Sequence, residues 1–92
     1  FAPGGEIAGE VAAVGARVEG WAVGDRVIGA TGWNGLAEFA LLPAANAFRL
    51  PDNRQFTEGS ALLMTYGTVI HALKDRGALR SGETLLVLGA AG

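Results

Sequence analysis

The chain has 92 residues, of which 50% are hydrophobic and 17% are charged, and this balance excludes a disordered or solvating tail. Its formal net charge of -2 has mixed signs and gives no electrostatic footprint for nucleic acid or an acidic membrane. The absence of cysteine removes disulfides, thiol nucleophiles and cysteine-ligated zinc, and it fits a reducing cytoplasm. No apolar run approaches the roughly 20 residues that span a bilayer. Because the chain opens on Phe1 and ends inside a glycine-rich motif, we expect it to be an internal piece of a longer protein.

The first half of the chain is predicted to be rich in β-strands. Short stretches of Val, Ile, Leu and Ala alternate with glycine turns, which is typical of a small antiparallel barrel or sandwich. The predicted strands fall within residues 4–15, 25–29, 36–42 and 47–50. An Asn-Gly pair at Asn34 and Gly35 marks a turn before the third strand, and Pro43 ends that strand.

The pattern changes to helix after Phe56. Thr57 is a suitable N-cap residue, and Glu58 favours the positive end of a helix dipole. A second helix is predicted over residues 68–76, with Gly77 as the residue that follows its end. The chain is therefore expected to pass from a β-rich part to a helical part near Phe56.

The last stretch, residues 84–92, carries the clearest functional pattern. Four consecutive apolar residues, 85–88, run into a corner of small residues that begins at Gly89. Such a run is typical of a strand buried on both faces of a parallel sheet. A strand that feeds a glycine-rich corner is how a dinucleotide-binding βαβ unit begins, with the pyrophosphate on the next helix N-terminus. Taken alone, the corner is equally well interpreted as an ordinary strand-to-loop turn.

Three blocks of sequence, taken together, point to a known family. They are residues 3–15 with 23–27, residues 35–39, and residues 82–92. In content, order and approximate spacing they resemble the zinc-independent quinone oxidoreductase branch of the medium-chain dehydrogenase/reductase superfamily. The resemblance implies a mixed α and β fold, in which residues 1–56 form part of a GroES-like β-barrel. Residues 57–92 then supply the first helices and the first strand of a Rossmann domain, with the cofactor in the cleft between the two parts.

The resemblance also implies where a nicotinamide cofactor lies. Gly89, Ala91 and Gly92 match the corner where backbone approaches the pyrophosphate. Thr68 matches a helix residue near the nicotinamide, and its hydroxyl can both donate and accept a hydrogen bond. The competing interpretation is that Thr68 bonds its own helix backbone. NADPH is the expected cofactor and NAD(H) stays open, while no catalytic side chain is identified.

Zinc chemistry is not expected, because Gly5 stands where zinc-dependent relatives have a ligating histidine. Without a Lewis acid, hydride transfer to a quinone or another conjugated acceptor is favoured over alcohol oxidation. The resemblance implies a cytoplasmic, homodimeric parent enzyme with a small-molecule substrate and no nucleic-acid or membrane partner. Two alternatives stay open: an enoyl reductase, including such domains in polyketide synthases, and a non-catalytic binding protein of the same fold.

Three other residues are expected to be structural rather than catalytic. Asp25 is predicted to support a turn beside Arg26. His71 lacks a visible Ser, Cys or carboxylate partner in the sequence, so we interpret it as an ordinary helix residue. Trp33 is predicted to cap the barrel, with a contact to substrate as the alternative.

Overall fold

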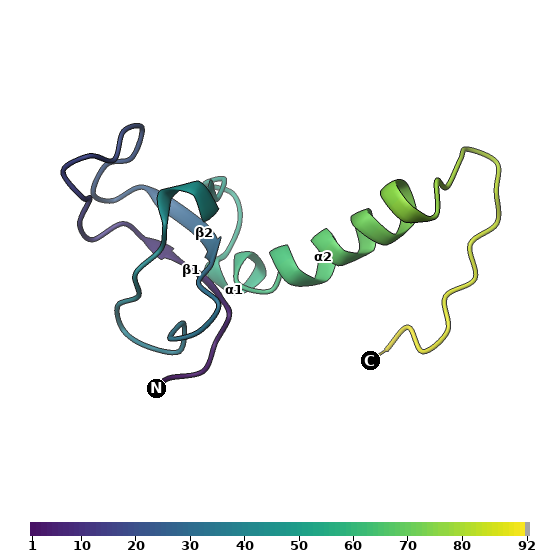
Figure 1. The fold of residues 1–92 in the computed structure, drawn as a ribbon, viewed down its shortest axis with the longest axis horizontal. Helices are drawn as coiled ribbons and strands as arrows, with labels where there is room; N and C mark the ends of the chain where they lie inside the picture. The colour runs from purple at the N-terminus through teal and green to yellow at the C-terminus, as the bar shows by residue number, and fades with distance from the viewer. Residues whose placement is uncertain (92) are drawn as a thin grey trace.

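The computed structural model describes residues 1–91, which form a small sheet at one end of an elongated molecule (Figure 1). Three antiparallel strands, β1 (Glu6–Glu10), β2 (Arg26–Ala30) and β3 (Ala47–Arg49), make the sheet in the order β1-β2-β3. A single 3-10 turn, η1 (Ala44–Asn46), leads into β3. The longest helix extends away from the sheet, and the chain then turns back as an irregular tail (Figure 1).

The central strand β2 carries the core. Val27 and Ile28 are buried, together with Leu50 just after β3. Neighbouring side chains of a strand point to opposite faces, so both faces of β2 need cover. Ile28 lies against the short helix α1 (Phe56–Gly59), whereas Val27 lines an apolar cavity on the opposite face. The strands predicted within residues 25–29 and 47–50 are therefore confirmed.

Helix α1 (Phe56–Gly59) begins with a capping box. The N-cap residue is Gln55, whose backbone N–H donates to Glu58 Oε2 at 2.9 Å, so the predicted cap at Thr57 is wrong by two residues. The position of Glu58 in the first turn is confirmed. A carboxylate there satisfies an otherwise unpaired N–H and favours the helix dipole.

The second helix is longer than the predicted range. Helix α2 (Leu63–Ile70) begins five residues before Thr68 and continues into a π-helix, η2 (His71–Arg76). The Gly77 N–H donates to the carbonyl of Ala72 at 2.7 Å, five residues back, as a π-turn requires. The helix ends at Arg76 and Gly77 follows it, as predicted, but Gly77 keeps a right-handed φ of -79° and the left-handed φ of 49° is at Ala78.

Two predicted strands are absent from the described residues. Residues 36–42 are irregular, although Leu36 N donates to Pro3 O at 2.9 Å. The buried strand predicted over residues 85–88 is also wrong for this structure, since these residues are irregular and 48% to 83% exposed. A strand must exchange backbone hydrogen bonds with a neighbour, and within residues 1–91 the sheet consists of β1, β2 and β3 alone. The mixed α and β class is confirmed, whereas residues 1–91 show no Rossmann sheet.

Within the described part of the chain, no helix has both the length and the apolar character needed to cross a membrane.

Candidate functional site

The N-terminus of α2 is held by a side chain from the sheet. Glu6 Oε1 accepts a hydrogen bond from the backbone N–H of Met64 at 2.8 Å. The N-cap residue of α2 is Leu62, which offers no side-chain cap of its own. The first N–H groups of a helix lack partners within the helix and carry partial positive charge, so a carboxylate stabilises them.

Thr68 lies one turn further along α2 and is exposed. Its Oγ1 donates to the carbonyl of Met64 at 2.5 Å, which is the backbone bond named above as the competing interpretation. This bond uses the hydroxyl proton but leaves acceptor capacity on the oxygen. Thr68 therefore presents a hydrogen-bond acceptor to any group that approaches this face of α2.

The small-residue corner lies at the end of the tail. Gly89 has a left-handed φ of 65°, and a Cβ atom at this position would meet nothing within 4 Å. Ala91 is exposed, and Gly92 lies outside the described residues. In Figure 1 the end of the tail lies apart from α2, so the structure does not bring the small-residue corner and α2 together.

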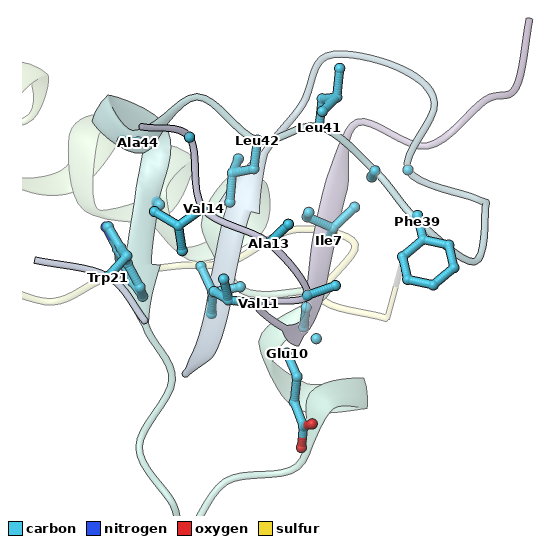
Figure 2. A pocket seen from close by; sticks show the side chains of 18 of the residues that line it. Ile7, Glu10, Val11, Ala13, Val14, Trp21, Phe39, Leu41, Leu42 and Ala44 are labelled. Carbon is cyan, nitrogen blue, oxygen red and sulfur yellow. The ribbon is translucent and has the colours of Figure 1, made fainter. Parts of the chain in front are cut away.

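An apolar cavity of about 450 Å³ lies beside the sheet, on the opposite face from α1 (Figure 2). Side chains from three stretches line it, among them Ile7, Val11, Trp21, Phe39 and Leu42. The carboxylate of Glu10 points away from these side chains in Figure 2. The cavity is lined mainly by apolar side chains and therefore suits apolar groups, with Glu38 as a second carboxylate in its lining. It includes none of the predicted cofactor residues.

Comparison with known proteins now assigns the family. Residues 1–52 match the model of the alcohol dehydrogenase GroES-like domain. Over its full length the chain is 43% identical to the "Quinone oxidoreductase-like protein 2 homolog" of Nematostella vectensis, and it covers 26% of that protein. It is 36% identical to the "Quinone oxidoreductase" of Homo sapiens, again over its full length, and covers 28% of it. The chain belongs to the family of the alcohol dehydrogenase GroES-like domain.

Further comparisons bear on the family of this chain. The chain is 42% identical, over 97% of its length, to a protein named "Highly reducing polyketide synthase phiA" from a fungal species, of which it covers 3%. No solved structure matches the chain. The chain spans about a quarter of the length of the quinone oxidoreductase-like relatives that it matches.

In this GroES-like domain, Asp25 supports the turn over residues 22–25, beside Arg26, as predicted. Its Oδ2 accepts from the Ala22 N–H at 2.9 Å and from Arg49 Nη1 at 3.0 Å. The Ala22 N–H first, and the Arg49 guanidinium second, lower the pKa of the Asp25 carboxyl from its usual 3.8. Arg49 also lies over the Trp21 ring, 4.6 Å from its centroid, so the cluster ties β3 to the loop before β2.

Arg26, the next residue in the sequence, joins the sheet to the start of α1. Its two terminal nitrogens donate to the carbonyls of Pro51 at 2.7 Å and Arg54 at 2.6 Å. The guanidinium also lies over the Phe56 ring, 4.5 Å from the centroid. The side chain of Arg26 thus fixes the turn that leads from β3 into the helical part.

Two single residues differ from expectation. His71 is a helix residue as predicted, but it does have a carboxylate partner, because its Nδ1 lies 2.9 Å from Asp75 Oδ2 and both side chains are exposed. The spacing of four residues was a signal for this pair that the sequence offered. Trp33 is 63% exposed and does not cap the sheet, while its neighbour Asn34 is tied to Ala2 by two hydrogen bonds. Among the described residues, no group of three His, Cys, Asp or Glu side chains could hold a metal ion.

Proposed function

We propose that this chain is part of an NADPH-dependent, zinc-independent oxidoreductase that transfers hydride to a quinone or another conjugated acceptor. Residues 1–56 belong to its GroES-like domain, and residues 57–92 open its Rossmann cofactor domain. The observation that carries the proposal is the likeness to proteins named quinone oxidoreductase along the full chain. As the resemblance implies, we also propose a cytoplasmic homodimer for the whole protein.

The residues proposed for the cofactor have suitable chemistry. Gly89 offers open, left-handed backbone that a pyrophosphate can approach closely, and Ala91 adds little bulk beside it. Gly92 completes this proposed corner. The Thr68 hydroxyl donates its hydrogen bond to Met64 O, so its oxygen is suited to accept from an N–H of the nicotinamide carboxamide. The nicotinamide supplies the hydride when bound, and the protein orients it.

The acceptor class follows from the chemistry at Gly5. This residue occupies the place of the zinc-ligating histidine in the zinc-dependent relatives and has no side chain to offer a metal. A quinone or enone spreads the developing negative charge over its own conjugated system and needs less help from a Lewis acid. We therefore propose a conjugated acceptor rather than an alcohol or a simple ketone.

The proposal is tested at Thr68 in the full-length protein that carries this chain. Thr68→Val removes the hydroxyl but keeps the β-branched shape, and Thr68→Ser keeps the hydroxyl. Loss of one hydrogen bond is worth about 0.5–1.5 kcal/mol, so Thr68→Val should weaken NADPH binding about 2- to 10-fold while Thr68→Ser stays near the parent value. Fluorescence titration with NADPH measures both. Equal affinities for the parent and Thr68→Val would refute the proposed contact.

An enoyl reductase is the second candidate, and the polyketide synthase relative favours it. Both reactions deliver hydride to a conjugated acceptor, so a panel of quinones and enoyl thioesters, with NADPH oxidation as the readout, distinguishes them. Turnover of thioesters alone supports the enoyl reductase. An absence of turnover together with no thermal shift on adding NADPH supports a non-catalytic relative.

A further inference from the structure

Glu6 and Thr68 are joined through the two peptide groups of one residue. On one side, the Met64 N–H donates to Glu6 Oε1 at 2.8 Å. On the other, the Met64 carbonyl accepts from Thr68 Oγ1 at 2.5 Å. A continuous polar connection therefore runs from the first residue of β1, through the first turn of α2, to the hydroxyl of Thr68.

Little else fixes α2 against the sheet. No residue of α2 is buried. Within residues 1–91, the Glu6–Met64 bond is the only hydrogen bond that links α2 to any of the three strands. The position of α2, and with it the position of the Thr68 oxygen, therefore depends strongly on this one carboxylate.

We propose that Glu6 is a positioning residue for Thr68. By accepting from the Met64 N–H, Glu6 fixes the backbone of Met64 and with it the carbonyl that accepts the hydrogen bond from Thr68 Oγ1. The Thr68 oxygen then faces outward as an acceptor. Glu6 itself touches no part of the cofactor in this arrangement. The inference rests on the proposed function, because it assigns Glu6 a role in presenting Thr68 to the nicotinamide.

A second helix-capping carboxylate provides a matched control. Glu58 caps α1 by accepting from the Gln55 N–H at 2.9 Å, as Glu6 caps α2, but it has no connection to Met64 or Thr68. Loss of either cap removes a comparable interaction from a helix N-terminus. Only the loss of Glu6 is expected to change the position of the Thr68 hydroxyl.

The test compares Glu6→Ala, Glu6→Gln, Glu58→Ala and Thr68→Val, and the double variant Glu6→Ala/Thr68→Val, in the full-length protein. We expect Glu6→Ala to weaken NADPH binding about 2- to 10-fold, the range for one lost hydrogen bond. Glu6→Gln should restore much of the affinity, because an amide oxygen still accepts from the Met64 N–H. Glu58→Ala should lower the melting temperature and leave the NADPH affinity within about 2-fold. Residues in one hydrogen-bond network are non-additive, so Glu6→Ala should have no further effect in the Thr68→Val background.

A measurement without cofactor separates the two proposals. Amide hydrogen exchange at Met64 should be faster in Glu6→Ala and unchanged in Glu58→Ala, whether or not Thr68 meets a cofactor. If Thr68→Val binds NADPH like the parent, the proposed contact of Thr68 fails. Two results would overturn the role of Glu6 and leave the proposed function standing. In the first, Thr68→Val weakens NADPH binding but Glu6→Ala does not. In the second, Glu6→Ala weakens binding equally in the parent protein and in Thr68→Val. Should Glu6→Ala fail to fold, Glu6→Met, which keeps the length of the side chain but has no oxygen to accept from the Met64 N–H, takes its place in the same comparison.

Discussion

Adding one methyl group at Gly59 should disturb the contact between α1 and the sheet. Gly59 is the last residue of α1 and is buried. A Cβ atom there would lie 2.6 Å from Ile28 Cγ2 and 3.1 Å from Leu50 Cδ1. Both of these side chains are themselves buried, at 4% and 5% exposure, so neither moves aside without disturbing the core. The close approach of α1 to β2 therefore requires a residue without a side chain.

Two opposing effects set the magnitude for Gly59→Ala. Alanine is favoured over glycine in a helix by about 1 kcal/mol. Inserting a methyl group into a packed core costs about 1–3 kcal/mol. At 2.6 Å the contact belongs at the upper end of that range, so we expect a net loss of about 1–2 kcal/mol in the free energy of unfolding. Gly67→Ala is the matched control, since α2 leaves open space within 4 Å of its Cβ position.

Urea denaturation of the chain, followed by tryptophan fluorescence, measures both variants. Gly67→Ala should stabilise the chain by about 0.5–1 kcal/mol, and Gly59→Ala should destabilise it, so the two midpoints move in opposite directions. A Gly59→Ala variant as stable as Gly67→Ala would refute the close packing of α1 on Ile28.

Two further predictions concern the arginine contacts of the sheet. The pKa of Asp25 is lowered in the folded chain, so its contribution to stability is present above its unfolded value of 3.8 and is lost as the pH falls through the folded pKa. Asp25→Asn should therefore flatten the loss of stability as the pH falls below about 3.8, and an unchanged urea-midpoint profile would contradict this. Arg26→Lys keeps the charge but loses the fork that reaches the Pro51 and Arg54 carbonyls together, so it should cost about 1–3 kcal/mol in the free energy of unfolding. Arg17→Lys, at an exposed loop position, should stay within about 0.5 kcal/mol, and an equal loss in the two variants would count against the role of Arg26.

Local signals in the sequence were sufficient to predict the three strands that form the sheet, although they also predicted a strand over residues 36–42 that is irregular in the structure. The β-branched pair at Val27 and Ile28 predicts β2, and the turn at Pro51 marks the end of the segment that contains β3. The start of α2 was predicted too late, because its N-terminal stabilisation comes from Glu6. That residue is 58 positions away from Met64 in the sequence. No local pattern reveals a helix cap that is supplied by a distant strand.

The candidate site was predicted mainly through family resemblance. Thr68 was named on that basis, but its bond to the Met64 carbonyl and the connection to Glu6 needed coordinates. For residues 85–88, in contrast, the local sequence pattern predicted a strand that does not form in the structure. Its apolar pattern describes what the segment would bury beside suitable neighbours, whereas pairing depends on a second strand that residues 1–91 do not supply.

The unpaired state of residues 84–88 has a consequence for handling the chain at high concentration. The segment is uncharged and rich in Leu and Val, and the side chains of Leu86 and Leu88 are 78% and 83% exposed. Uncharged, β-favouring stretches of this kind aggregate when they meet a free sheet edge, and here β1 and β3 are such edges. Colloidal stability of the protein is thus tied to whatever shields these leucines from neighbouring molecules.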